Sequence, residues 1–137
     1  MRKLLTAGVL AGAVLGAAMA TIAAAAADKE KTYQGVGYAC TGIGDERNDP
    51  RWAAYPAKVM LTTKGGAFVA DGQITIQDAQ GKTVLETTCD APWLLVRLAP
   101  GRYQVTAKVA DYTQKGTLIV PAKGQGTLTL RFAEIAG

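Results

Sequence analysis

The sequence of 137 residues contains no histidine and no serine. Without histidine, a Ser-His-Asp or Cys-His nucleophilic site has no general base, and the usual zinc sites lose a principal ligand. A threonine or lysine nucleophile would need an activating base, and no motif in the chain supplies one. We therefore expect a protein that is not an enzyme and that uses neither a metal nor another cofactor.

Clustered positive charge is also missing. Lys and Arg total 15 against 11 Asp and Glu, a net charge of +4, but Arg2 and Lys3 belong to the N-terminal segment discussed next, and without them the balance is 13 against 11, or +2. The basic residues are scattered singly, with no interleaved row of aromatic residues. A nucleic-acid-binding surface needs such a cluster, so we expect no nucleic acid partner.

The N-terminal segment has the layout of a secretory signal peptide. Arg2 and Lys3 precede a long apolar run, which ends in two A-x-A cleavage sites, Ala18-Met19-Ala20 and Ala25-Ala26-Ala27. This order of positive, apolar and small residues is typical of export signals. We predict that residues 1–27 are a signal peptide and that the mature protein is periplasmic or secreted, with no stable membrane span after cleavage.

An uncleaved membrane anchor is the alternative for this segment. Residues 4–27 are long enough to cross a bilayer, which requires about 20 apolar residues. Their second half, however, is mostly alanine, which drives membrane insertion only weakly. A lipoprotein anchor is not expected, because Cys40 lies far from the apolar run. Cleavage after Ala27 leaves 110 residues (137 − 27), enough for one domain of common size.

We expect a flexible leader at 28–36 and a single β-sandwich domain at 37–137. Short runs of alternating polar and apolar residues, separated by turn residues, predict strands at Tyr38-Ala39-Cys40, Lys58–Thr63, Phe68-Val69-Ala70, Gln73–Gln77, Thr83–Cys89, Trp93–Leu98, Tyr103–Val109, Gly116–Val120 and Gly126–Phe132. Strands at this spacing are typical of an all-β sandwich or barrel. The pattern predicts an antiparallel β-sandwich of about seven strands in two sheets packed face to face.

One polar stretch departs from the strand pattern. It contains Asp45, Pro50 and Pro56, together with two aromatic residues. Asp is a preferred N-cap residue, acidic residues are favoured in a first helical turn, and proline interrupts helices. We predict a short helical segment near residues 45–55, capped by Asp45, interrupted near Pro50 and stopped by Pro56.

The segment Leu98–Ala107 carries the sequence L-x-P-G-x-Y-x-V-x-A directly after a predicted strand. This motif resembles the carboxypeptidase regulatory-like domain, a transthyretin-like (prealbumin-like) sandwich related in architecture to Ig-like domains. Residues Val69–Lys82 resemble a hairpin of the same family, and the resemblance covers roughly residues 57–132. The Gly42–Arg47 segment is similar to one in a group of small exported bacterial proteins, mostly uncharacterised.

The resemblance implies a sandwich of a kind that is found in adhesins, sugar-binding modules, chaperone-like domains and stalks alike. A purine-derivative hydrolase also has the transthyretin-like fold, but its His/Arg site cannot be built from a chain without histidine. In the family motif, Pro100 and Gly101 supply the backbone angles of a tight turn. The Tyr103 hydroxyl is then expected to bond the backbone near a sheet corner.

Two cysteines, Cys40 and Cys89, are present. An even number in an exported chain favours a disulfide bond. For a loop of this length, the chain-entropy estimate of its stabilisation is about 4 kcal/mol. Two free thiols in the core are the alternative.

The irregular polar stretch also supplies the candidate contact region, since loops on rigid scaffolds commonly carry recognition. Its residues are Asp45, Glu46, Arg47, Trp52 and Tyr55. Trp52 and Tyr55 could form an exposed aromatic platform, or could simply cap an open end of the sandwich. Trp93 is expected in the core, and the strand at Leu94–Leu98 could accept a partner strand if it lies at a sheet edge.

The acidic residues suggest two other functions. Asp45, Glu46 and Asp49 could bind calcium, but arginines interrupt them and the usual ligand spacing is missing. A hydrolase could use Asp45 or Glu46 as its carboxylate. The favoured hypothesis is an exported, non-enzymatic binding or accessory protein of the bacterial cell envelope, whose partner is an unknown protein or glycan; a structural or assembly subunit of an envelope complex is a further alternative.

Overall fold

The computed structural model describes residues 30–133, so the predicted signal peptide lies outside the described residues. The chain divides into the units Met1–Glu30 and Lys31–Gly137. The described part of the second unit contains the strands β1 (Lys31–Tyr33), β2 (Val36–Thr41), β3 (Ala57–Thr63), β4 (Gly72–Gln77), β5 (Thr83–Cys89), β6 (Trp93–Val96), β7 (Gly101–Val109), β8 (Tyr112–Val120) and β9 (Gly126–Phe132), and the 3-10 helices η1 (Gly44–Asn48) and η2 (Pro50–Ala54). Among residues 30–133, no helix is long and apolar enough to cross a bilayer.

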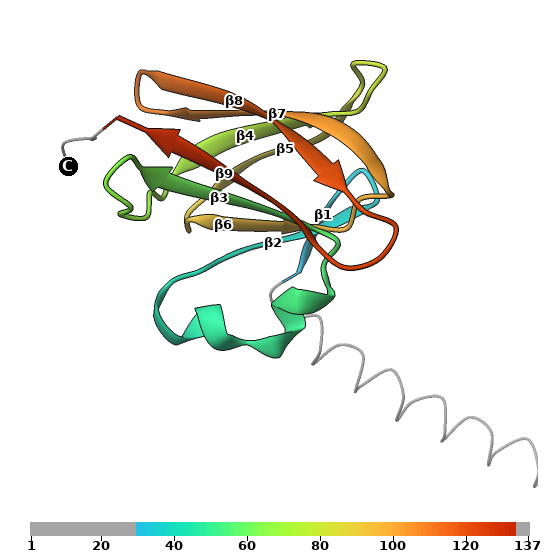
Figure 1. Ribbon diagram of the computed structural model, residues 1–137, viewed down its shortest axis with the longest axis horizontal. Helices are drawn as coiled ribbons and strands as arrows, with labels where there is room; N and C mark the ends of the chain where they lie inside the picture. The colour runs from blue at the N-terminus through green and yellow to red at the C-terminus, as the bar shows by residue number, and fades with distance from the viewer. Residues whose placement is uncertain (1–29, 134–137) are drawn as a thin grey trace, which may run out of the picture. The chain divides into compact units, whose positions relative to one another are not determined.

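The strands form a two-layered sandwich (Figure 1). The first sheet has five strands in the order β1-β2-β6-β3-β9, and the second has four in the order β5-β4-β7-β8. The predicted all-β sandwich is therefore confirmed. The first sheet is mixed rather than purely antiparallel. After β8 the chain passes from the second sheet to the first, where β9 runs parallel to β3 with Gly126 opposite Ala57.

The prediction of a flexible leader at 28–36 is wrong for residues 31–36. Lys31 pairs with Tyr38 and Tyr33 pairs with Val36, so β1 and β2 form a hairpin. Its two turn residues, Gln34 and Gly35, have φ angles of 46° and 85°. Two consecutive positive φ angles belong to the tight hairpin turn whose twist matches the strands. The sequence signal was weak because polar residues surround the turn.

Alternation of side chains builds the core between the sheets, as predicted. On β4, Ile74 and Ile76 are buried, while Gln73 and Gln77 are exposed. The largest fully buried side chains of this core come from both sheets: Phe132, Leu61, Ile74, Ile76, Leu85, Leu94 and Leu118. Each such side chain contributes about 1.5–3 kcal/mol when removed from water, so the interior is the main source of stability.

The Tyr103 hydroxyl donates a hydrogen bond to the Ala99 carbonyl oxygen at 2.7 Å. This confirms the bond from tyrosine to backbone expected at the sheet corner. Burial raises the pKa of the Tyr103 phenol, and the charge of Asp78 raises it further. The phenol therefore remains a donor throughout the neutral range.

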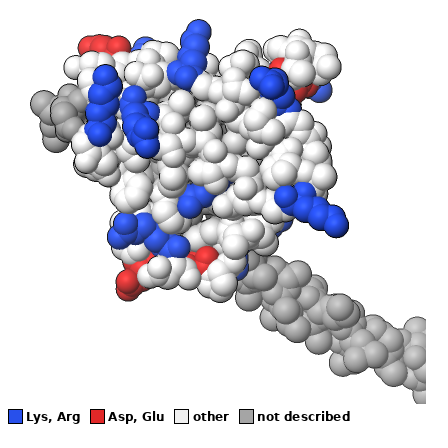
Figure 2. All heavy atoms as spheres, in the orientation of Figure 1, with Lys and Arg blue, Asp and Glu red and all other residues white. Residues whose placement is uncertain are grey.

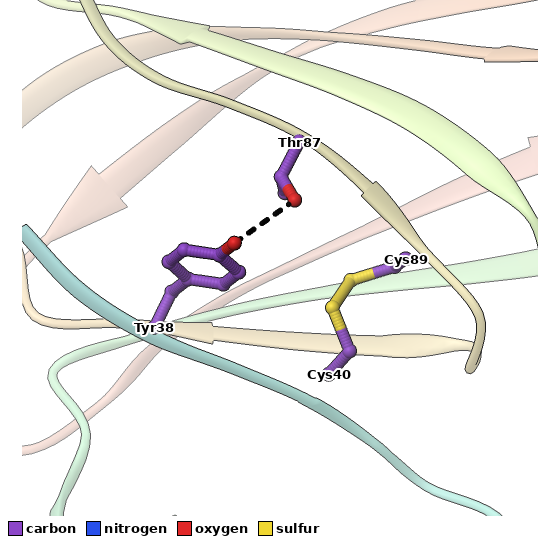
Figure 3. The surroundings of a disulfide bond; sticks show 4 residues. All are labelled: Tyr38, Cys40, Thr87 and Cys89. Atoms are coloured by element: carbon purple, nitrogen blue, oxygen red, sulfur yellow. Dashed lines mark hydrogen bonds between the residues drawn. A yellow bond between two sulfur atoms is a disulfide. The ribbon is translucent and has the colours of Figure 1, made fainter. Parts of the chain in front are cut away.

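The cysteines form a disulfide bond between the sheets (Figure 3). Cys40 lies on β2 of the first sheet and Cys89 ends β5 of the second, with Cα atoms 5.5 Å apart and a sequence separation of 49. Beside this bond, the Thr87 hydroxyl donates to the Tyr38 hydroxyl at 3.2 Å, which adds a second link between the layers. The predicted disulfide is confirmed.

Replacing both cysteines by alanine should lower the free energy of unfolding by about 4 kcal/mol, because the unfolded chain regains the entropy of an open loop. Urea denaturation followed by tryptophan fluorescence measures the change. A variant with Thr87→Val, which removes only the hydroxyl link, serves as the control and should lose about 1 kcal/mol. Equal stability of the double cysteine variant and the native protein would contradict this role.

Candidate functional site

The segment of η1 and η2 covers the outer face of the first sheet, the face that points away from the second sheet (Figure 1). Trp52 and Tyr55 pack there against Ala39 of β2 and Leu95 of β6. Trp52 is only 5% exposed and Tyr55 only 4%. The segment therefore closes a second, smaller core outside the sandwich.

Hydrogen bonds hold the segment of η1 and η2, which we call the cover, in place. The Trp52 indole Nε1 donates to the Glu46 carbonyl oxygen at 2.7 Å. From the loop before β9, the Gln125 amide Nε2 donates to the carbonyl oxygens of Trp52 at 2.8 Å and Tyr55 at 2.9 Å. These bonds satisfy main-chain groups that β-ladders cannot reach. The cover is thus an integral, hydrogen-bonded part of the domain.

The predicted helical segment near residues 45–55 is confirmed, but its predicted N-cap residue is wrong. The residue before η1 is Ile43, which makes no side-chain cap, so the assignment of Asp45 as N-cap is wrong. Asp49 caps η2 instead, because its carboxylate accepts the Arg51 backbone N–H at 2.9 Å and Pro50 opens the helix. Proline is favoured at the first helical position, where its missing donor costs nothing.

Cationic side chains lie over aromatic rings along this face. The pairs are Arg47 on Phe68, Arg51 on Trp52, Lys58 on Trp93 and Arg97 on Tyr55, at 5.5, 5.2, 3.5 and 4.3 Å from the ring centroids. Such contacts contribute about 0.5–1 kcal/mol each at exposed sites. In Figure 2, basic side chains spread across the visible face, and over η1 and η2 they lie beside acidic ones, as in the Arg51–Asp49 salt bridge.

The structure separates the five candidate contact residues into two groups. Trp52 and Tyr55 turn inward, so neither ring offers an open face for stacking. Glu46 is half-buried, and its carboxylate accepts the Thr41 hydroxyl at 3.3 Å. Asp45 and Arg47 are exposed. Of the five candidates, Asp45 and Arg47 are therefore the exposed ones.

Trp93 was expected in the core, but it lies on the outer face of β6. It is half-buried and packs against the cluster of Trp52, Tyr55 and Leu95. Its strand runs between β2 and β3, so the idea that Leu94–Leu98 accepts a partner at an open edge is wrong. Alternation does not indicate which side chains of β6 face the core, because all four of its residues are apolar.

A hollow opens next to this cover. It has a volume of about 290 Å³ and is lined by Gly42, Ile43, Gly44, Arg47, Phe68, Ala70 and Pro92. Ile43 is 57% exposed and Phe68 is 44% exposed, and both are large apolar side chains. We call this concavity the 43–68 hollow. Among its lining side chains, only that of Arg47 is polar.

Arg47 supplies a guanidinium group. Its Cζ lies 5.5 Å from the centre of the Phe68 ring, and its Nε donates to the Gly44 carbonyl oxygen at 3.3 Å. Within residues 30–133, no carboxylate forms a salt bridge with Arg47. Stacking and the Nε bond hold the guanidinium plane, while its outer nitrogens remain available to an anion.

Gly42 is the reason that the hollow lies beside β2. Its φ angle is +106°, and a Cβ atom at this position would lie 2.7 Å from Cγ of Trp93. Only glycine allows the chain to pass over the indole ring and then diverge from the sheet. The divergence leaves a gap between residues 42–44 and Phe68.

Ile43 and Phe68 were missed as candidate site residues. Phe68 was predicted to continue a strand, but the structure gives it a single bridge to Thr62. Two buried polar atoms without a hydrogen-bond partner in residues 30–133, Thr62 Oγ1 and Trp93 Nε1, belong to residues next to Phe68. The one available signal was the apolar residue between two glycines in Gly42-Ile43-Gly44.

A second hollow lies over the outer face of the second sheet. It has a volume of about 440 Å³ and is lined by Gln73, Thr75, Glu86, Thr87 and Thr88. All of these side chains form hydrogen bonds readily, and none presents a large apolar surface. Binding sites usually combine apolar lining with a few polar groups. The 43–68 hollow fits that description better.

The acidic residues do not line the 43–68 hollow. Asp49 is held by Arg51, whose Nε and Nη2 donate to its Oδ2 at 2.9 and 2.7 Å. Within the described chain, the structure brings no three metal-ligating side chains together. The lining of the hollow thus combines large apolar side chains with one guanidinium group.

Comparison with known proteins adds no relative: no protein-family model matches the chain, and no curated protein matches it. The site must therefore be interpreted from its own geometry.

Replacing Trp52 by alanine should lower the free energy of unfolding by about 3 kcal/mol, as for other buried aromatic residues. Thermal unfolding of Trp52→Ala measures this loss. Arg47→Ala is the control, because Arg47 is exposed and its removal should cost less than about 1 kcal/mol. Unchanged stability of Trp52→Ala would show that the outer cluster is not a structural core.

The Asp49 carboxyl should titrate below its ordinary pKa of 3.8, because hydrogen bonds from the Arg51 side chain and backbone, and then its charge, favour the ionised form. A lowered folded-state pKa means that the cap stabilises the protein above pH 3.8 and that this contribution fades as the pH falls through the lower value. NMR titration of the carboxyl carbon measures the pKa. In Arg51→Gln the value should return toward 3.8; a normal pKa in the native protein would contradict the interaction.

Proposed function

We propose that the protein is an exported, non-enzymatic binding or accessory module of the bacterial cell envelope, and that the 43–68 hollow is its contact site. One observation carries the proposal: two exposed large apolar side chains, Ile43 and Phe68, meet at a concavity beside a guanidinium without a carboxylate partner in the described chain. Exposed apolar groups that share a hollow are typical of interaction sites.

The surrounding scaffold supports a binding role. One wall, residues 42–44, leads into the cover anchored by Trp52 and Gln125. The other wall is bonded to β3, an interior strand of the first sheet. A site held by rigid neighbours loses little conformational entropy on binding.

The side chains of the hollow and the predicted compartment both support this proposal. No carboxylate lines the hollow, so nothing there favours the alternative of a carboxylate-dependent hydrolase. A disulfide bond between the sheets suits an oxidising compartment. Together with the predicted export signal and the resemblance to carboxypeptidase regulatory-like domains, it supports a place in the envelope.

Site-specific photo-crosslinking tests the proposal. A photo-reactive residue in place of Ile43 should crosslink to a component of envelope extracts, either protein or glycan, and addition of Phe68→Ala should reduce the yield at least about fivefold, since one wall of the site is lost. The same photo-reactive residue in place of Ile119, which is also exposed, is the matched control. Equal yields at the two positions, or a yield that is insensitive to Phe68→Ala in a folded variant, would exclude the hollow as the contact site.

A further inference from the structure

We infer that the 43–68 hollow binds an extended peptide segment by short β-strand addition, and that this segment carries an apolar side chain two residues from an acidic one. The inference rests on the proposed function, because it names the kind of partner for the same site. Three observations carry it: the direction of the Phe68 main chain, the exposed apolar pair, and the Arg47 guanidinium.

The Phe68 backbone faces away from β3. The residues on either side of it make the bonds to that strand: Thr63 N–H donates to the Ala67 carbonyl oxygen at 2.8 Å, and Val69 N–H donates to that of Leu61 at 3.0 Å. In an antiparallel ladder, a residue between two such bonds directs its own N–H and C=O to the opposite side.

That opposite side is where the hollow lies. The sheet order β2-β6-β3 places residues 42–44, which follow β2, across from residues 67–69, which pair with the end of β3. Strand β6 begins only at Trp93 and does not fill this gap. Within residues 30–133, neither the N–H nor the C=O of Phe68 has a hydrogen-bond partner. One donor and one acceptor therefore remain for an incoming strand.

The side chains define what such a strand must carry. Ile43 and Phe68 form the open apolar walls of the hollow, and its volume of about 290 Å³ suits one or two side chains rather than a large ligand. Arg47 lies over the Phe68 ring on the same side. Residues two apart in an extended chain share one face, so an apolar residue and an acidic residue at that spacing reach both features.

Arg47 gives the charge preference. Because it has no carboxylate partner in the described chain, binding an anion costs no existing ion pair. A charge-assisted bond from arginine to a carboxylate is about twice as strong as a neutral one. The site should therefore prefer glutamate to glutamine at the acidic position of the partner, and this preference should weaken as salt increases.

The test uses the peptide Thr-Leu-Thr-Glu-Thr, acetylated and amidated at its ends, titrated into the purified protein and followed by NMR. We expect saturable binding with a Kd on the order of 1 mM or tighter, with shifts at the Phe68 amide. A peptide with Gln in place of Glu should bind about tenfold more weakly. In Arg47→Gln the two peptides should bind equally, whereas in Ile119→Thr, a control on the second sheet, the preference should persist.

A second experiment tests the main-chain pairing. Two peptides carry N-methyl groups on alternate residues, so that each blocks the amides along one edge of the extended chain. The peptide blocked on the edge that faces Phe68 should bind at least about fivefold more weakly, whereas the other should bind normally. Equal binding of both peptides would overturn strand addition. Equal affinity for 4-methylpentanoate, an apolar acid without a peptide chain, would overturn it too.

The two proposals can fail separately. If the peptides do not bind but the photo-reactive residue at position 43 still crosslinks in a Phe68-dependent manner, the hollow is a contact site for another ligand and only the peptide inference is overturned. If the peptides do not bind and the crosslinking does not depend on Phe68, the proposed contact site is overturned as well.

Discussion

The apolar centre of the first sheet is the constraint on which the rest of the structure depends. All four residues of β6, Trp93-Leu94-Leu95-Val96, are apolar, so this strand has no face suited to water. Leu94 and Val96 enter the core between the sheets, and Leu95 faces outward with no exposure at all. A strand of this composition must be covered on both sides, and the second sheet can cover only one.

The cover on the other side explains the irregular segment. Residues 44–54 fold back over Leu95, and Trp52 and Tyr55 fill the space above it. Two short 3-10 helices serve here because proline at position 50 and the cap at Asp49 divide the stretch. The aromatic residues that looked like a recognition platform are thus used for burial.

The hollow is a consequence of how this cover begins. The chain must leave β2 above Trp93, and Gly42 is the residue that allows the close approach. After that divergence, Arg47 of the cover and Trp93 of β6 contact the Phe68 ring, but they leave Phe68 44% exposed. The proposed contact site is therefore the place where covering the sheet is incomplete, which accounts for exposed apolar groups beside a well-packed core.

The sequence by itself determined the all-β class and most strand positions, because alternation and turn residues are local signals. The even number of cysteines favoured a disulfide bond without excluding free thiols, and the Tyr103 hydrogen bond was expected from the resemblance of its motif. Only the tertiary structure decided that β9 joins β3 in parallel, that Trp52 and Tyr55 point inward, and that Ile43 and Phe68 meet. These features arise between segments far apart in the chain, where burial depends on which faces are already covered, and no local pattern encodes that.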